Sequence, residues 1–297
     1  MSHRRLRSLL FVPGHNPELL KKAARTDADA LILDLEDSVQ PLCNKQLARD
    51  CIQAFLESSA KPDKSIFIRV NDLSSGHLLR DLLCLTLPAV DGFVYPKSKV
   101  AADVYSFDQL LTAVELHKNL EVGTFKIIPL IETTNAVTNV SSICAASPRV
   151  IAVAYGCEDY VADLGGVNDK AGVCLSVPRA LIAMAAKANN VLPIDTVHVR
   201  LHDLDDLRMN LTISKTLGYE GMLVLHPKEL AAVNETFSPS ESEVAAAREL
   251  LRLYAEAQAS GKGVVYVNNT FVGPPLVLAA EKLLDKHQAL RPKGADR

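Results

Sequence analysis

The sequence predicts a (β/α)8 TIM barrel, an α/β fold, followed by a C-terminal helical arm. About eight short apolar runs lie along roughly the first 230 residues, and stretches with helical periodicity separate them. Continuous apolar strands separated by helices are typical of a parallel sheet covered on both faces, and about eight such units indicate closure into a barrel. A doubly wound open sheet is the alternative fold, but no GxGxxG or P-loop motif follows any of these runs.

Each predicted strand is a short run rich in β-branched and aromatic residues. In chain order these runs occupy residues 8–14, 30–37, 65–72, 92–98, 126–134, 150–159, 195–201 and 221–229. Helical patterns between them include residues 17–25, 44–58, 104–120 and 177–190. Strands and helices therefore alternate along the chain, as a barrel of this kind requires.

The remaining C-terminal sequence predicts a separate arm. We expect a catalytic barrel domain over residues 1–237 and an α-helical arm over residues 238–297. The arm contains a helical pattern at 241–258, a β-like run at 263–267 and an apolar helix at 276–284. That much apolar surface needs a partner, so we expect the arm to pack on a neighbouring subunit. A lid that folds back on its own barrel is the alternative.

Composition narrows the class of protein. The chain has 297 residues, a net charge of −3 and only 5% aromatic residues, which gives no support for nucleic-acid binding. No run reaches the roughly 18–20 apolar residues that cross a bilayer, so no membrane partner is expected. The six cysteines form no CxxC pair, and no secretory segment is recognised, so we expect reduced thiols in a cytoplasmic protein.

Charged residues recur where the predicted strands end, which in a barrel is the face that carries the active site. In chain order these residues are Glu36, Asp37, Arg69, Lys97, Glu132, Asp159 and His226. Arg69 lies between Ile68 and Val70 inside an apolar strand, and a buried guanidinium needs an anion beside it. We therefore predict that Arg69 binds an anionic group.

Glu132 follows the apolar strand residues 129–131, and buried carboxylates are rare unless they are paired or bind a metal. Asp159 is expected at the end of the next strand. Two carboxylates completed by water molecules suit Mg²⁺, so we predict a magnesium site there. An ion pair of Glu132 with Arg69 or Lys97 is the structural alternative, and no HExxH motif supports zinc.

Three further residues are interpreted as structural. Cys157 lies close to the predicted site, but no histidine partner is evident for it, which favours a small buried thiol over a nucleophile. His198 and His202 lie on or just after the predicted seventh strand. We expect both to be packing or loop residues rather than metal ligands.

Seven ordered stretches resemble the citrate lyase β-subunit-like (CitE-like) proteins, which belong to the HpcH/HpaI aldolase and malyl-CoA lyase superfamily. From Arg7 to about residue 237 these are RSLLFVPGHNPELLKKA, DALILDLEDSV, IFIRVND, GFVYPKS, IIPLIETTNAV, AVAYGCEDYVADLGG and GYEGMLVLHPKEL. The resemblance implies a (β/α)8 barrel, built as a homotrimer or hexamer. It also implies Mg²⁺-dependent formation or cleavage of a C–C bond between an acyl-CoA and a short 2-oxo acid.

The resemblance also implies roles for individual residues. Glu132 and Asp159 match the metal ligands, and Arg69 matches the arginine that holds the oxo acid and its enolate. Glu36 and Asp37 match a pair that orders Arg69 and metal-bound water. Lys97 and Glu132 are expected to contact substrate with Arg69.

Coenzyme A is expected to contact two parts of the chain. Lys22, Lys45 and Arg49 match basic positions near its phosphates. His226 and Pro227 match a turn near its adenine.

The sequence departs from the family pattern in the arm. Relatives carry an aspartate that reaches a neighbouring subunit and is thought to act as acid and base, but in VNNTFVGPP (267–275) this position is Gly273. Arg200 also stands where relatives often have an acidic residue. The group that moves the proton is therefore left open.

The expected function is that of an Mg²⁺-dependent C–C lyase. It would cleave a 3-hydroxyacyl-CoA thioester of the citryl-CoA or citramalyl-CoA type to acetyl-CoA and oxaloacetate or pyruvate. A CoA-independent 2-oxo-acid aldolase is one alternative, and a partner subunit of a citrate lyase assembly is another. The presence of Arg69, Glu132 and Asp159 argues against a non-catalytic subunit.

Overall fold

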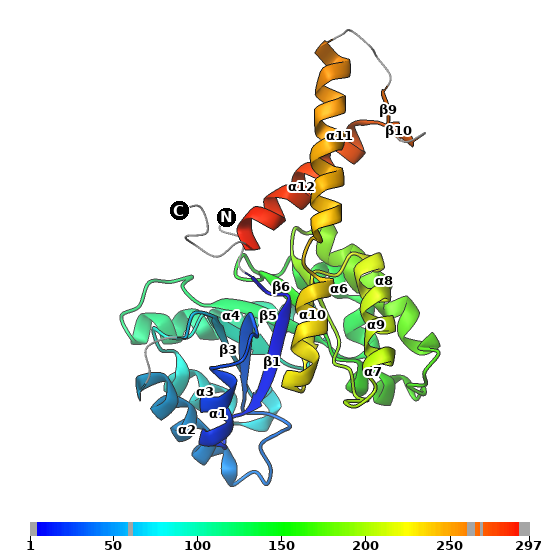
Figure 1. The fold of residues 1–297 in the computed structure, drawn as a ribbon. Helices are drawn as coiled ribbons and strands as arrows, with labels where there is room; N and C mark the ends of the chain where they lie inside the picture. The colour runs from blue at the N-terminus through cyan, green and yellow to red at the C-terminus, as the bar shows by residue number, and fades with distance from the viewer. Residues whose placement is uncertain (1–4, 59–61, 260–264, 268–269, 291–297) are drawn as a thin grey trace. The chain divides into compact units, whose positions relative to one another are not determined.

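The structure is a computed structural model that describes residues 5–58, 62–259, 265–267 and 270–290. Residues Leu6–Asn234 form one compact unit, and the residues from Glu235 onward form most of a second. The first unit is a closed barrel in which neighbouring strands are hydrogen-bonded in the order β1 to β8 (Figure 1). The predicted (β/α)8 fold is therefore confirmed.

All eight barrel strands pair in parallel. They are β1 (Ser8–Pro13), β2 (Ala30–Asp34), β3 (Ser65–Arg69), β4 (Gly92–Tyr95), β5 (Lys126–Ile131), β6 (Ala152–Tyr155), β7 (Leu192–Asp195) and β8 (Gly221–Val224). Because β1 pairs with both β2 and β8, the sheet closes on itself. Parallel pairing brings all the carboxyl ends of the strands to one face of the barrel.

Helices follow the strands and form the outer layer of this unit (Figure 1). They are α1 (Pro17–Ala23), α2 (Asn44–Ser58), α3 (Leu78–Leu85), α4 (Ala101–His117), α5 (Thr134–Thr138), α6 (Val140–Cys144), α7 (Cys157–Leu164), α8 (Val173–Ala188), α9 (Leu204–Leu217) and α10 (Leu230–Thr236), with 3-10 turns η1 (Leu73–Ser75) and η2 (Pro227–Glu229). Side-chain caps begin two of these helices. The side chains of Asn16 and Asp203 accept hydrogen bonds from backbone N–H groups in the first turns of α1 and α9.

Apolar side chains from alternate strand positions fill the barrel interior. The core cluster includes Leu9, Ala30, Ile32, Phe67, Val94, Ile128, Ala154, Ile194 and Leu223. Glycine starts β8 because a Cβ at Gly221 would lie 2.0 Å from the carbonyl oxygen of Leu6. Tight packing of this kind leaves the interior without room for a ligand, so chemistry is confined to the ends of the strands.

The seventh strand was predicted at residues 195–201, and this prediction was wrong. The strand is β7, Leu192–Asp195, and the alternating residues after it form a loop. The apolar face of the ladder ends at Ile194, since Asp195 is held by a buried ion pair with Arg179 from α8. His198 is bonded to carboxylates instead of pairing with a neighbouring strand.

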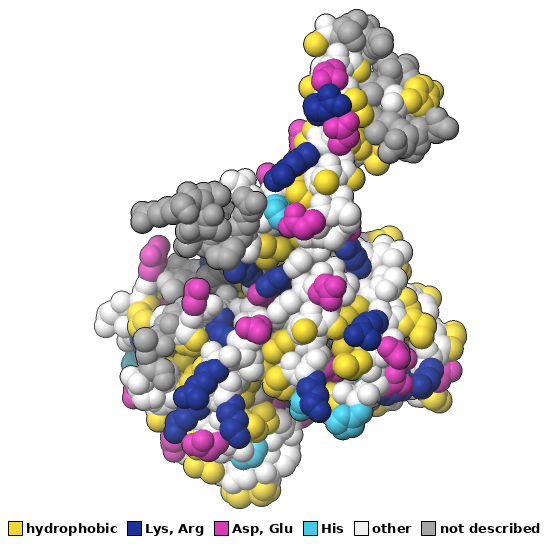
Figure 2. All heavy atoms as spheres, in the orientation of Figure 1, with side chains coloured by type: hydrophobic (Ala, Val, Ile, Leu, Met, Phe, Trp, Pro, Cys, Tyr) yellow, Lys and Arg dark blue, Asp and Glu magenta, His cyan; other side chains and the backbone are white. Residues whose placement is uncertain are grey.

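The second unit contains α11 (Glu241–Ala259), the antiparallel strands β9 (Val265–Val267) and β10 (Thr270–Val272), and α12 (Pro274–Leu290). α11 packs against α12. Tyr266, Leu276 and Leu278 are exposed, and Figure 2 shows hydrophobic side chains between charged ones on this unit. Residues 263 and 264 of the expected β-like run lie outside the described residues. Among the described helices, none has the length and hydropathy needed to cross a membrane.

Candidate active site

Arg69 and Asp34 form the centre of the site. They are the last residues of β3 and β2, and the barrel register places them side by side. Arg69 Nε and Nη2 donate to the two carboxylate oxygens of Asp34 at 2.6 Å and 2.7 Å, and the guanidinium carbon lies 4.8 Å from the ring centre of Phe11. This two-pronged bond fixes the guanidinium plane and leaves Nη1 for other partners.

Sequence reasoning did not assign Asp34 to the site. Asp34 is 1% exposed, and burial alone would raise its pKa. The charge and hydrogen bonds of Arg69, with bonds from Ser38 and the Glu36 N–H, outweigh burial and lower that pKa. The signal was its position two residues after Ile32, on the strand face that points into the barrel.

Glu36 lies beside the remaining nitrogen of Arg69. Its Oε2 is 3.0 Å from Arg69 Nη1, and its Oε1 is 3.3 Å from Lys97 Nζ. Neither oxygen accepts an aligned hydrogen bond from the residues that the structure describes. Burial is the main cause that raises the pKa of Glu36 to about 7. Asp37, whose Oδ2 is 3.2 Å from the same Arg69 nitrogen, has a largely exposed side chain.

Glu132 follows β5 directly and is 2% exposed. Its Oε1 accepts the backbone N–H of Lys97, a residue held in the left-handed region at φ 53°. Gly156 leaves space for this carboxylate, since a Cβ there would lie 2.8 Å from Glu132 Cβ. Burial, followed by repulsion from Glu36, raises the pKa of Glu132 to about 8; repulsion from Asp159 adds to this.

The donor set suits a hard divalent cation. Asp159 is exposed in the first turn of α7, and its charge acts on Glu132. Carboxylates that raise one another's pKa are stabilised by a cation placed between them, and oxygen donors are the ligands that Mg²⁺ prefers. Within the described ranges no group of three or more His, Cys, Asp or Glu side chains is arranged around a metal position. Glu132 and Asp159 would therefore need water or substrate to complete the coordination.

The three basic residues expected near the phosphates of coenzyme A lie in different environments. Lys45 is buried, and its Nζ donates to the carbonyl oxygens of Leu35 and Glu36, both at 2.7 Å. Arg49 is buried as well, and its Nη1 is 2.6 Å from Asp81. Neither of these cations is presented to a phosphate at the surface. Lys22, by contrast, is exposed on α1.

His226 and Pro227 form the start of η2, just after β8. The His226 Nδ1 accepts the backbone N–H of Lys228, and Pro227 is exposed. This places the turn at the same barrel face as Arg69 and Glu132. The His226 ring caps the turn, which is a structural role.

Cys157 and His198 have the structural environments that their sequence positions favoured. Cys157 is buried, and burial raises the pKa of its thiol to about 12, so the thiol stays protonated at neutral pH. His198 lies between two buried carboxylates, with its Nε2 3.0 Å from Asp206 and its Nδ1 3.2 Å from Glu229. These bonds tie the loop after β7 to α9 and η2.

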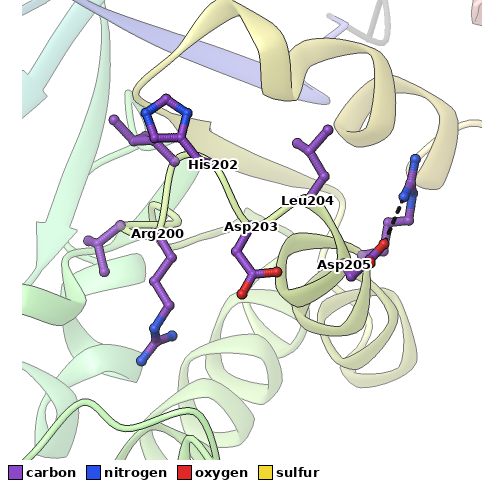
Figure 3. A pocket seen from close by; sticks show the side chains of 8 residues that line it. Arg200, His202, Asp203, Leu204 and Asp205 are labelled. Atoms are coloured by element: carbon purple, nitrogen blue, oxygen red, sulfur yellow. Dashed lines mark hydrogen bonds and ion pairs between the residues drawn. The ribbon is translucent and has the colours of Figure 1, made fainter.

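A separate pocket of about 910 Å³ lies in the loop after β7 and opens to solvent. Arg200, His202 and Asp203 are among its lining residues (Figure 3). It lies on the barrel face where the strands end, but it shares no lining residue with the cluster around Arg69 and Glu132. We therefore place the candidate chemistry at the charged cluster, where carboxylates with perturbed pKa values lie beside a buried arginine.

Comparison with known proteins identifies relatives over nearly the whole chain. The citrate lyase subunit beta of Leuconostoc mesenteroides subsp. cremoris is 30% identical over 285 residues, covering 96% of this chain and 94% of that protein. An L-malyl-CoA/beta-methylmalyl-CoA lyase of Rhodobacter capsulatus is 33% identical, with 94% of this chain and 93% of that protein covered.

Solved structures give the same result. The CitE protein of Mycobacterium tuberculosis in complex with magnesium, acetoacetate and coenzyme A matches with a TM-score of 0.77 and 26% identity, covering 97% of this chain and 100% of that chain. The family described as HpcH/HpaI aldolase/citrate lyase matches residues 7–227. The chain therefore belongs to the HpcH/HpaI aldolase/citrate lyase family.

Proposed function

We propose that this protein is an Mg²⁺-dependent C–C lyase that cleaves a 3-hydroxyacyl-CoA thioester to acetyl-CoA and a short 2-oxo acid. The observation that carries the proposal is the cluster at the ends of β2, β3 and β5. There, burial raises the pKa of Glu36 to about 7 and that of Glu132 to about 8 beside Arg69, and the charge of Glu36 adds to the shift of Glu132. The relatives named as a citrate lyase subunit beta and an L-malyl-CoA/beta-methylmalyl-CoA lyase, and the CitE complex with magnesium, acetoacetate and coenzyme A, support it.

The site residues have distinct roles in this proposal. Glu132 and Asp159 would hold Mg²⁺, which when bound polarises substrate oxygens as a Lewis acid. Arg69 donates through Nη1, which is bonded to the exposed Asp37 rather than to Asp34, to the oxo-acid carboxylate or to the oxygen on which charge develops. Asp34 keeps the guanidinium plane fixed, so the donor is oriented before substrate binds.

A CoA-independent 2-oxo-acid aldolase is the second candidate function. It is favoured by the burial of Lys45 and Arg49, which removes two of the three cations expected near the CoA phosphates. Gly273 also offers no side chain for proton transfer. A citrate lyase-like partner subunit remains a third and weaker alternative.

One screen separates these functions. The purified protein with Mg²⁺ is incubated with citryl-CoA, citramalyl-CoA and malyl-CoA, and in parallel with CoA-free 4-hydroxy-2-oxo acids, with 2-oxo acid release as the readout. We expect release from at least one thioester, and none when Mg²⁺ is replaced by a chelator. Release only from the CoA-free substrates would support the aldolase and contradict the proposal.

We also propose that the C-terminal arm joins subunits of a homotrimer or hexamer. Exposed apolar side chains on α12 and β9 support this. A chain ending after residue 238 should sediment as a species with fewer subunits than the full chain. If the truncated chain sediments with the same number of subunits as the full chain, the arm does not join subunits.

A further inference from the structure

The backbone of Glu36 is fixed on both sides by hydrogen bonds, whereas its carboxylate is held by ion pairs with Arg69 and Lys97. The Glu36 N–H donates to Asp34 Oδ1 at 2.9 Å, and its carbonyl oxygen accepts from Lys45 Nζ at 2.7 Å. The residue is 5% exposed, and neither carboxylate oxygen accepts an aligned hydrogen bond from the described residues. Leaving such atoms unbonded is costly, and a buried group of this kind needs an explanation.

The other carboxylates of the cluster do not share this combination. Both oxygens of Asp34 are occupied by Arg69, Ser38 and the Glu36 N–H. Asp37 is largely exposed, and Glu132 accepts a backbone N–H. Glu36 alone among these is buried, has a fixed backbone, and has two oxygens that lie near cations but accept no aligned hydrogen bond from the described residues.

We propose that Glu36 is the acid and base that moves the proton in C–C bond cleavage, an inference that rests on the proposed lyase function. Its Oε2 is 3.0 Å from Arg69 Nη1, so a substrate oxygen held by Arg69 lies beside it. Burial that raises the pKa of Glu36 to about 7 supports this role, because a group with a pKa near the working pH can both accept and return a proton.

The step balances without another reactant. The ionised carboxylate of Glu36 takes the proton of the substrate 3-hydroxyl group. The bond between the carbinol carbon and the thioester α-carbon breaks, its electron pair forms the acetyl-CoA enolate, and the hydroxyl carbon becomes the ketone of the 2-oxo acid. The protonated Glu36 then gives that proton to the enolate carbon, which completes acetyl-CoA and restores the carboxylate.

The test compares the wild-type chain with Glu36→Gln, Glu36→Ala and His15→Asn. His15 is the matched control, since it lies after β1 and its Nδ1 is also buried without a hydrogen bond in the described part of the chain. Turnover of the active thioester is measured with added formate from zero to molar concentration. The binding of pyruvate with Mg²⁺ is measured by calorimetry in each variant.

We expect Glu36→Gln and Glu36→Ala to lose on the order of 10²–10⁴-fold in kcat, with pyruvate affinity within a few-fold of wild type. Formate, which supplies the missing carboxylate, should raise turnover of the Ala variant but not of the Gln variant. His15→Asn should keep its kcat within tenfold.

Three results would overturn the inference. The first is a Glu36→Gln variant that turns over within tenfold of wild type. The second is a loss in Glu36→Ala that formate does not restore. The third is loss of pyruvate binding together with turnover, which would make Glu36 a positioning residue for Arg69. A wild-type chain that cleaves no thioester would instead contradict the proposed function, and this inference with it.

Discussion

Two buried arginines at opposite ends of the barrel show how this molecule separates stability from chemistry. Arg149 precedes β6, at the amino-terminal end of the strands, and Arg69 ends β3 at the carboxyl-terminal end. Every guanidinium nitrogen of Arg149 donates within the fold: Nε to Asp108, Nη1 and Nη2 to Glu115. Arg69 donates Nε and Nη2 to Asp34 and Nη1 to the exposed Asp37, but its Nη1 also faces the buried Glu36, whose oxygens accept no aligned hydrogen bond from the described residues.

A structural buried charge differs from a functional one in how completely its partners are bonded. Around Arg149 the acceptors are also bonded from elsewhere, since Ser147 donates to Asp108 and two backbone N–H groups donate to Glu115. A buried polar network that is complete in this way stabilises a fold. A network left incomplete at the face where barrel strands end is arranged for a ligand.

The largest expected effect comes from exchanging each arginine for lysine. Arg69→Lys keeps the charge but loses the planar fork, so we expect kcat/KM to fall on the order of 10²-fold or more. Arg149→Lys should instead lower the free energy of unfolding by about 3 kcal/mol, because it breaks a buried network. Steady-state kinetics and denaturant unfolding measure the two effects.

These two substitutions test the comparison directly. The kcat of Arg149→Lys per folded molecule should remain near wild type. If Arg69→Lys works at a near wild-type rate, then Arg69 is structural, as Arg149 is. The two arginines would then not differ in function.

A smaller effect is expected in the dependence of stability on pH. In the metal-free protein the pKa of Glu132 is raised to about 8 and that of Glu36 to about 7, from 4.5. A raised carboxyl pKa means that folding favours the protonated form. This contribution is complete below pH 4.5 and is lost as the pH rises through 7 to 8. We therefore expect the free energy of unfolding to fall between pH 5 and pH 8 in a chelator.

The variant Glu132→Gln sharpens this expectation. It removes one titrating group, so its unfolding free energy should fall less steeply over the same pH range. Arg149→Lys serves as the control, being less stable at every pH but with the slope of the wild type. Parallel slopes in wild type and Glu132→Gln would show that Glu132 does not titrate in this range.

Sequence alone predicted the barrel because its strands are continuous apolar runs, and it located Arg69, Glu36 and Glu132 because polar residues stood at the ends of those runs. It missed Asp34, which belongs to the apolar run and is defined as a site residue only by the register that pairs it with Arg69. Its position two residues after Ile32 could have indicated that it faces the barrel interior, but a pairing between distant segments is not visible in the spacing of one segment.

The assignment of Lys45 and Arg49 to coenzyme A shows a different difficulty. They lie on the same face of α2 as Ala48 and Ile52, and this is the buried face of the helix. The spacing of these residues, at i, i+3, i+4 and i+7, could have indicated it. The family resemblance suggested that Lys45 and Arg49 contact coenzyme A, whereas the helical spacing favoured a place for both in the buried face of α2. The roles of the site residues stay predictions.

Mg²⁺ is expected to bind between the site carboxylates Glu132 and Asp159. Calorimetric titration of Mg²⁺ at pH 7, in two buffers of different ionisation enthalpy, measures both the affinity and the protons released. Since Glu132 with a pKa of about 8 is mostly protonated at that pH, we predict that binding releases a proton. We also predict that Glu132→Gln and Asp159→Asn lose the binding. Mg²⁺ affinity that is unchanged in both variants, or binding without proton release, would contradict a magnesium site at Glu132 and Asp159.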